Sequence, residues 1–379
     1  MDTRWIDQPD ELQDFCESIE EGPVAVDSES DHFHAYRARV CLLQVATRQQ
    51  SVLIDPLALE EDDLAPLFEL FEEPGIVKIL HSARNDINEF DRDWGVGIAS
   101  LFDTQIAARF LGYRRNSLDW LVEEVVGEKP PKSFRRYDWT IRPLSEQARI
   151  YAATDVIHLF PLYDRFGPEL DASQWRGPFD QQCRYVAEET THQPNDFEPE
   201  GWREINEGRR LEGRRQAAFR ALYLWRHHLC MERNEAAIHV FPNDAMAEVA
   251  RRLPESADEL TGSDRLPDEL LETHGEEMVE LVGQAEVSDV PEEVDDREAD
   301  DGGAPSRAER ARYNEMRRWR NRTADELDIP TEFVATNATL EEIAADPPSE
   351  VEELERFRPI LPWHRQLFGE EIVRLANAT

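Results

Sequence analysis

Two patterns of hydrophobic and polar residues divide the chain near residue 200. Before that point, short apolar runs predict four strands, at 23–26, 40–45, 51–54 and 76–80. The polar turn at 47–50 predicts a hairpin between the second and third strands. Apolar residues at helical spacing predict helices over 11–19, 64–71, 103–111, 117–126 and 145–159. A hairpin followed by alternating strands and helices predicts an α/β core, in which helices flank a mixed sheet.

After residue 200 the pattern is helical throughout, in two blocks. The segments 242–254 and 335–347 both combine a capped entry, a short amphipathic helix and a proline stop, and an arginine-rich helix precedes each. We therefore expect a duplicated helical module, with two unrelated helical hairpins as the alternative. The stretch between the blocks has nine acids, one arginine and two glycines, which is typical of a linker. The predicted domains are 1–200, 206–285 and 305–379, with the acidic linker at 286–304.

The net charge is extreme. Acids outnumber Lys and Arg by 81 to 42 over 379 residues, for a formal charge of −39, and the only lysines are Lys78, Lys129 and Lys132. Acids spread this evenly predict a halophilic protein, because at about 1 M salt the Debye length falls to about 3 Å and screens self-repulsion. The alternatives are an acidic mesophilic protein and a protein with a single acidic tail, and the even spread of the acids argues against the tail.

Several protein classes are excluded. No apolar run approaches the roughly 20 residues that span a bilayer, and residues 1–15 have neither the basic start nor the apolar stretch of a signal peptide. The four cysteines are scattered and form no C-x-x-C pair, which argues against a disulfide scaffold and a zinc site. We expect a soluble, cytoplasmic protein without a membrane partner, acting as a monomer.

The first candidate chemistry follows the strand at 23–26. Asp27 and Glu29 are two residues apart, so that on a strand both carboxylates point to the same side. A cation would relieve their repulsion, and oxygen ligands suit Mg²⁺ or Mn²⁺. The alternative is a solvated acidic turn. Asp86, which follows the strand at 76–80, says little when taken alone.

A second candidate lies on the helix at 145–159. Ser145 is a good N-cap, and Tyr151 and Asp155 lie one turn apart on a largely apolar face. Burial of an aspartate is costly unless it is paired or bound to a metal. The alternative for Asp155 is a capping role or a salt bridge, for example with Arg109 or Arg149.

Together these motifs resemble the DEDD superfamily of 3′–5′ exonucleases, in the branch with a tyrosine in its last motif, and within it the ribonuclease D family. The motifs are D-x-E on an early strand, an aspartate some sixty residues later, and Y-x-x-x-D on a late helix. The resemblance covers about residues 5–190 and includes supporting matches at 40–44, 55–56, 81, 103–104, 138–139 and 142–144. The two helical blocks resemble HRDC domains. The resemblance implies an RNase H-like exonuclease core followed by two small all-α domains.

The resemblance also implies a mechanism with two divalent cations, Mg²⁺ or Mn²⁺. Asp27, Glu29 and Asp155 would hold one cation, Asp27 would bridge to the second, and Asp86 would support the second. Tyr151 would orient the attacking water. The implied function is trimming of RNA from its 3′ end to 5′-mononucleotides, with precursor tRNA as the expected substrate. The alternatives are a nuclease that acts on DNA ends, single-stranded DNA included, and an inactive nucleic-acid-binding scaffold.

Binding of RNA by such an acidic chain requires local positive charge. Residues 206–233 and 306–322 each carry seven arginines, against three and two glutamates respectively. Aromatic residues are interleaved with them, namely Phe219, Tyr223, Trp225, Tyr313 and Trp319. Arginine binds phosphate bidentately and stacks on bases, which predicts RNA contacts. The alternative is that these arginines pair with acids on neighbouring helices.

Substrate contacts are also expected closer to the carboxylates. Lys132, Arg135 and Arg136 precede the last motif and could guide the strand. Ser30 and Asp31 follow the D-x-E motif, where ribonuclease D often has an aromatic residue. Phe33 and Tyr36 are therefore the candidates for a wedge against the terminal base.

Overall fold

A computed structural model of the chain describes residues 3–19, 21–129, 134, 136–192, 197–291 and 306–378. The chain forms two compact units. Unit 1 consists of Met1–Glu29, Val40–His192 and Asp300–Thr379, and unit 2 consists of Ser30–Arg39 and Gln193–Ala299. Each unit is described by itself.

Unit 1 contains the predicted mixed sheet. Its six strands run in the order β1-β4-β3-β2-β5-β6 and are β1 (Thr3–Ile6), β2 (Val24–Ser30), β3 (Val40–Ala46), β4 (Ser51–Ile54), β5 (Lys78–Leu80) and β6 (Leu101–Asp103). The predicted hairpin is confirmed, because β3 and β4 pair in antiparallel fashion. The pairs β1–β4, β2–β5 and β5–β6 are parallel. The edge strands β1 and β6 were not predicted, since each is only three or four residues long and mixes polar with apolar residues.

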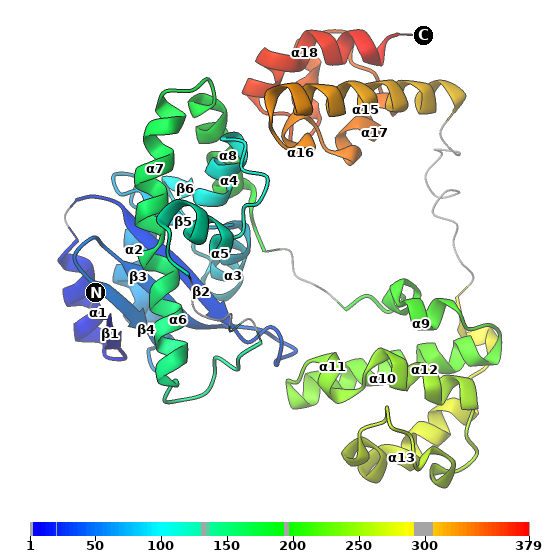
Figure 1. Cartoon of the computed structure of the whole chain (residues 1–379). Coiled ribbons are helices and arrows are strands. Elements are labelled where there is room, and N and C mark those ends of the chain that lie inside the picture. The colour runs from blue at the N-terminus through cyan, green and yellow to red at the C-terminus, as the bar shows by residue number, and fades with distance from the viewer. Residues whose placement is uncertain are drawn as a thin grey trace. The chain divides into compact units, whose positions relative to one another are not determined.

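Helices cover both faces of the sheet (Figure 1). They are α1 (Pro9–Glu17), η1 (Glu61–Leu64), α2 (Ala65–Glu72), α3 (Arg84–Trp94), α4 (Thr104–Phe110), α5 (Leu118–Leu121), η2 (Val122–Val126), α6 (Glu146–Ile157), α7 (Leu159–Asp171) and α8 (Arg176–Glu189). Every residue of β3 is buried. Leu43 and Val45 join the larger hydrophobic cluster, and Leu42 joins a smaller cluster with Trp139 and Ala152. The central strand therefore lies between two apolar layers, as its continuous hydrophobic run requires.

The predicted elements differ from the structure in three ways. The strand predicted at 23–26 continues to Ser30, so that Asp27 and Glu29 lie within β2 rather than after it. The helix predicted at 117–126 is α5 followed by a wider turn of π-helix. The helix α3, which holds Asp86 in its first turn, was not predicted, and neither were α7 and α8. None of these differences separates a predicted site residue from the other predicted site residues around it.

Unit 2 holds the first helical block. Its helices are η3 (Gly201–Glu204), α9 (Asn206–Arg209), α10 (Arg214–Arg233), α11 (Ala237–Val240), α12 (Asn243–Arg252), η4 (Ala257–Leu260), α13 (Asp268–Gln284) and η5 (Val287–Asp289). They enclose a separate hydrophobic core that includes Trp202, Phe219 and Met246. Tyr36 packs against this core.

The second helical block is part of unit 1. Its helices are α15 (Arg307–Leu327), α16 (Thr331–Val334), α17 (Asn337–Ala345), η6 (Val351–Arg356) and α18 (Pro362–Ala376). The ring of Phe333 lies 4.5 Å from that of Phe110 on α4, and the backbone N–H of Trp363 donates to Gln181 of α8 at 3.0 Å. One hydrophobic cluster runs through both parts. The second block is thus packed on the α/β core of unit 1.

A repeated arginine contact supports the expected duplication. Arg226 in the middle of α10 donates to the carbonyl of Phe241 and to the side chain of Asn243, which lie 15 and 17 residues further along the chain. Arg320 of α15 makes the same two bonds at the same spacings, to Ala335 and Asn337. Both arginines are buried. Two unrelated hairpins would have no reason to share this internal bond pattern.

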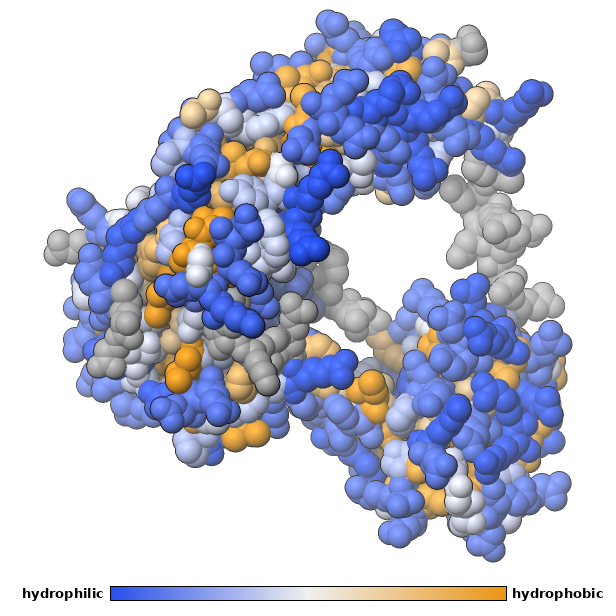
Figure 2. Space-filling model, in the orientation of Figure 1, coloured by the Kyte–Doolittle hydropathy of each residue, from blue (hydrophilic) through white to orange (hydrophobic). Residues whose placement is uncertain are grey.

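Within the described ranges, no helix combines the length and apolar character needed to cross a membrane. Hydrophilic side chains cover most of the face of the molecule in Figure 2, as a strongly acidic composition requires.

Candidate active site

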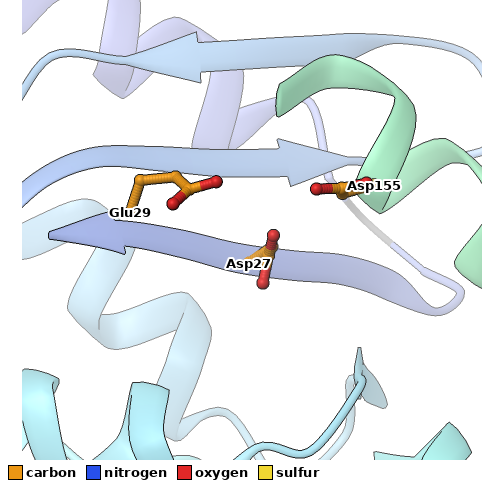
Figure 3. A group of neighbouring side chains, drawn as sticks. All are labelled: Asp27, Glu29 and Asp155. Atoms are coloured by element: carbon orange, nitrogen blue, oxygen red, sulfur yellow. The ribbon is translucent and has the colours of Figure 1, made fainter. Parts of the chain in front are cut away.

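Three carboxylates from two distant parts of the sequence converge in unit 1. Asp27 and Glu29 extend from β2, and Asp155 extends from α6 toward them (Figure 3). One oxygen of each carboxylate lies within 4.8 Å of those of the other two. The D-x-E motif and the last motif therefore meet, as the family resemblance implied.

The local sequence explains why α6 presents Asp155 to the sheet. Ser145 caps the helix and accepts a hydrogen bond from the backbone N–H of Ala148 at 3.2 Å. Ala148 and Ala152 are fully buried against the sheet, and their small side chains let α6 approach it closely. Asp155 is one turn beyond Ala152 and is itself 7% exposed. The apolar stripe of α6 thus brings the carboxylate to β2.

Asp86 joins the group through a residue that the sequence analysis passed over. The hydroxyl of Ser28, between Asp27 and Glu29, donates to Asp86 Oδ1 at 2.6 Å. Asp103 fixes the start of α3, the helix of Asp86, because its carboxylate accepts from the backbone N–H groups of Ser82 and Ala83. A small hydroxyl residue inside a D-x-E motif was the available signal for Ser28.

The electrostatics are those of a cation site. Burial, followed by the charge of Asp155, raises the pKa of Asp27 well above its ordinary value. Burial and then Asp27 raise the pKa of Glu29 and of Asp86 in the same way. Burial raises the pKa of Asp155 to about 7. Carboxylates that repel one another in a largely enclosed site stay ionised at neutral pH only beside a positive charge, and an all-oxygen donor set fits a hard divalent cation.

Glu89 is a further carboxylate that the sequence analysis missed. It lies three residues after Asp86 on α3, hence on the same side of that helix. Its charge contributes to the raised pKa of Asp27, of Glu29 and of Asp86. The helical spacing from Asp86 was the signal.

The hydroxyl of Tyr151 donates a hydrogen bond to the carboxylate of Asp155. Its ring lies 5.3 Å from that of Phe134 and 6.2 Å from that of Trp139. Burial and the charges of Asp155 and Glu29 raise the pKa of the Tyr151 phenol. The group therefore stays protonated and serves as a hydrogen-bond donor at neutral pH.

The salt-bridge alternative for Asp155 does not hold. Arg109 pairs with Glu332 and lies over the ring of Phe333. The guanidinium of Arg149 lies 5.8 Å from the centre of the Trp5 ring. Both arginines have other partners, so a metal-ligand role remains for Asp155.

The predicted substrate contacts have varied surroundings. Phe33 and Tyr36 belong to unit 2, where Phe33 is 40% exposed and the Tyr36 hydroxyl is hydrogen-bonded to His227 Nδ1 at 2.5 Å. Arg136 is exposed. Lys132 and Arg135 lie outside the described residues. The wedge and the guiding contacts stay predictions.

Part of each arginine cluster is structural. Arg226 and Arg320 are buried, and Arg220 pairs with Glu200. Phe219 and Trp319 are buried in hydrophobic cores, so these two aromatics do not offer a stacking surface. The alternative of internal pairing thus accounts for some arginines, but not for the exposed ones on α15 described below.

Comparisons with known proteins agree with this geometry. A 3′–5′ exonuclease family matches residues 3–171, and the HRDC domain matches residues 215–282 and 309–375. The exosome complex exonuclease RRP6 of Saccharomyces cerevisiae is 32% identical over 264 residues, which are 66% of this chain and 36% of RRP6. The chain thus spans about a third of that relative's length.

Ribonuclease D offers a match along nearly the whole chain. The Nitrobacter hamburgensis enzyme is 30% identical over 370 residues, which are 97% of this chain and 93% of that protein. The crystal structure of Escherichia coli RNase D, an exoribonuclease involved in structured RNA processing, has 26% identity and a TM-score of 0.67, covering 99% of this chain and 98% of that one. Because this similarity includes both the exonuclease core and the helical blocks, and the core brings the carboxylates together as a divalent-metal nuclease requires, the chain belongs to the ribonuclease D family of 3′–5′ exoribonucleases.

Proposed function

We propose that this chain removes nucleotides successively from the 3′ end of RNA and releases 5′-mononucleotides with the help of two divalent cations, Mg²⁺ or Mn²⁺. The observation that carries the proposal is the convergence of Asp27, Glu29 and Asp155 within 4.8 Å, with the Tyr151 hydroxyl bonded to Asp155. Asp27, Glu29 and Asp155 would hold one cation, and Asp27 and Asp86 would hold the second. Bound there, the cations would supply Lewis-acid stabilisation of the charge that develops on the phosphodiester oxygens.

The chain's own groups orient the reactants. Tyr151 remains a neutral phenol, so it positions the attacking water by a hydrogen bond rather than by taking its proton. Its ring is packed against Phe134 and Trp139, which fixes the hydroxyl. Ser28 holds Asp86 in place by donating to Oδ1. These contacts order the site before substrate arrives, which lowers the entropic cost of reaching the reactive geometry.

We propose that a cationic stripe on α15 holds the body of the RNA. The stripe consists of Arg307, Arg310, Asn314, Arg317 and Asn321, all of which are exposed. Their spacing of three and four residues places them on one side of the 21-residue helix. Arginines bind phosphates bidentately, and the amides can donate to phosphate or ribose oxygens. The positive charges of the stripe locally offset the repulsion between RNA and a chain with a net charge of −39.

The remaining assignments rest on the family resemblance and are proposals as well. We propose precursor tRNA 3′ ends as a natural substrate, a monomer as the active form and the cytoplasm as the compartment. We also propose the domain limits 1–200, 206–285 and 305–379, with a linker at 286–304. The HRDC matches at 215–282 and 309–375 support the two helical domains.

The decisive assay compares single-stranded RNA and DNA of one sequence, labelled at either end, in Mg²⁺, Mn²⁺ or EDTA. We expect 5′-labelled RNA to shorten stepwise, 3′-labelled RNA to lose its label as a mononucleotide, and EDTA to stop both. Asp155→Asn should be inactive, and the exposed Asp325→Asn on α15 should retain activity. Preferential cutting of DNA would favour the alternative nuclease, and no cutting of either would favour an inactive scaffold.

The stripe needs its own test, and deletion of residues after 200 is unsuitable because it would expose Phe110 and its aromatic neighbours. Charge reversal at Arg310 and Arg317 in the full-length chain avoids this problem. We expect a raised KM for long RNA with little change for a short oligonucleotide. Reversal of Arg48, an exposed arginine on the turn between β3 and β4, is the matched control.

A further inference from the structure

One arginine of unit 1 uses every donor of its side chain. Arg142 Nε and Nη2 donate to the two carboxylate oxygens of Asp55 at 2.6 and 2.7 Å. Nη2 also donates to the carbonyl of Cys41 at 2.7 Å, and Nη1 donates to the carbonyls of Trp139 and Ile141 at 2.7 and 2.9 Å. A guanidinium has five N–H groups, so the five bonds saturate it.

These bonds tie three strands to one segment. Asp55 follows β4 directly, and its backbone N–H donates to the carbonyl of Ile6 on β1 at 2.9 Å. Cys41 lies on β3, and the Arg142 guanidinium is 5.3 Å from the centre of the ring of Trp5 on β1. On the other side, Trp139 and Ile141 belong to the segment that leads into α6. The arginine therefore fastens that segment to the sheet.

The fastened segment continues into the helix that carries the last motif. Leu144 is buried beside Ala148 and Ala152, and Ser145 caps α6. Asp55 is 6% exposed at its side chain, so solvent screens the ion pair little. The bond network and the buried stripe together determine where the N-terminus of α6 lies.

We propose that Arg142 and Asp55 form a positioning pair that sets Asp155 and Tyr151 opposite Asp27 and Glu29. This inference rests on the proposed two-cation function. Metal–ligand distances tolerate only about 0.2 Å. A small displacement of α6 would therefore weaken cation binding at Asp155 and move the Tyr151 hydroxyl, without any loss of a ligand. Arg142 is a positioning residue, because all its donors are bonded to Asp55 and to backbone carbonyls.

Two substitutions weaken the pair by different routes. Arg142→Lys keeps the charge but leaves a point-like ammonium with three donors, which cannot bridge Asp55 and three carbonyls. Asp55→Asn keeps the shape but removes the negative charge. The matched control is Arg48→Lys, because Arg48 also makes a two-pronged ion pair, with Asp164 at 2.5 and 2.8 Å. That pair is 43% and 53% exposed and joins the sheet to α7, which bears none of the proposed ligands.

The test uses full-length protein and measures Mn²⁺ affinity by electron paramagnetic resonance in the absence of RNA. Turnover is then measured against Mn²⁺ concentration, together with the KM for RNA and the melting temperature. We expect Mn²⁺ affinity to fall about tenfold or more in Arg142→Lys and in Asp55→Asn, as for other residues that orient metal ligands. Excess Mn²⁺ should restore part of the turnover, and the KM for RNA should hardly change. Arg48→Lys should match the wild type in all these respects.

The outcomes separate the two proposals. If the wild type binds Mn²⁺ but both pair variants bind it equally well and lose only melting temperature, Arg142 and Asp55 are purely structural and this inference is wrong. If both variants fail to fold, the pair serves the fold as a whole and the inference is likewise overturned. If the wild type itself neither binds Mn²⁺ nor cleaves RNA, the proposed function fails instead.

Discussion

Ser28 donates a hydrogen bond of 2.6 Å to Asp86, so the middle residue of the D-x-E motif reaches the aspartate on α3. Burial and the charge of Asp27 raise the pKa of Asp86, and the Ser28 hydroxyl counteracts this. Ser28→Ala should raise that pKa further and leave less of the carboxylate ionised for cation binding. A hydrogen bond to a charged group contributes about 1.5–3 kcal/mol, so we expect turnover to fall about tenfold or more near pH 7.

The pH dependence gives this first prediction its direction. The deficit of Ser28→Ala should be larger at pH 6 than at pH 8, because alkaline pH ionises Asp86 despite a higher pKa. Ser28→Thr keeps a hydroxyl and is the control. Equal turnover of the alanine variant and the wild type at both pH values would show that the bond has no role in catalysis.

The second prediction concerns the cost of gathering carboxylates. Burial raises the pKa of Asp155 to about 7, above its value of about 3.9 in an unfolded chain. Between those pH values the folded state binds more protons than the unfolded state. The stabilising contribution of protonated Asp155 to the free energy of unfolding is therefore fully present below pH 4 and is lost as the pH rises through 7. Asp155→Asn should therefore abolish hydrolysis yet stabilise the metal-free protein at pH 8, by up to about 4 kcal/mol.

Denaturant unfolding in EDTA at pH 4.5 and pH 8 measures this effect. The advantage of Asp155→Asn should shrink at the lower pH, and Mg²⁺ should stabilise the wild type much more than the variant. Asp325→Asn controls for the loss of one negative charge. A variant that is less stable than the wild type at pH 8 would contradict the repulsion argument.

The third prediction separates water orientation from cation binding. Tyr151→Phe keeps the ring packed against Phe134 and Trp139 but removes the hydroxyl that bonds to Asp155. Groups that position a proton-transfer partner typically contribute about 10²–10⁴-fold in rate. We expect a loss of turnover in that range, with a Mg²⁺ dependence close to that of the wild type. A variant with unchanged turnover would reduce Tyr151 to a core residue.

Sequence patterns located the carboxylates of the cluster better than they predicted the strand limits around them. The D-x-E and Y-x-x-x-D motifs depend on local spacing, which fixes the side of a strand or helix that a residue occupies. Their convergence could be expected only from family resemblance, because no local pattern records that α6 packs on β3 and β4 with Asp155 facing the carboxylates of β2. The edge strands β1 and β6 were not predicted, because short strands carry little intrinsic sequence signal. They form through pairing with strands distant in the chain or separated by a helix, β1 with β4 and β6 with β5.

Other features depend on partners far away in the chain. The role of Ser28 becomes visible only beside Asp86, and that of Arg142 only beside Asp55. The buried Arg226 and Arg320 show the opposite error, since an arginine in a basic cluster looked available for RNA until its carbonyl and asparagine partners were seen. Charge patterning counts residues but cannot say which of them face inward.

A fourth prediction concerns the second helical block. Burial lowers the pKa of His364 to about 4. Its ring stacks on Trp363 at 3.8 Å, and its Nδ1 accepts from the Leu361 N–H. Between pH 4 and 6.5 the unfolded state binds the extra proton, so this contribution to stability is present above pH 6.5 and is lost on acidification, by about 3 kcal/mol.

His364→Gln should remove this part of the pH dependence. We would follow unfolding of the full-length protein by the fluorescence of its tryptophans at pH 7 and pH 4.5. The stability difference between the two pH values should be smaller in His364→Gln than in the wild type or in His228→Gln, a change at an exposed histidine of α10. Identical pH profiles for all three proteins would show that His364 does not titrate between the folded and unfolded states.

The last prediction tests the halophilic interpretation of the charge. Added salt weakens phosphate binding in most nucleic-acid-binding proteins, because counterion release becomes less favourable. This chain has a net charge of −39, so its acidic groups repel one another and also repel RNA. Salt screens both repulsions. We therefore expect the melting temperature to rise with KCl well beyond 0.2 M and the turnover optimum to lie at high salt, where short-range contacts from exposed arginines such as Arg310 and Arg317 still hold RNA.

Both quantities should be measured from 0.1 to 3 M KCl at fixed free Mg²⁺. Repeating the melting series near pH 4.6, the isoelectric point of the sequence, controls for general salt effects, since the salt dependence due to net charge should nearly vanish there. A melting temperature that stays flat or falls at neutral pH would mean that the acidity has another cause.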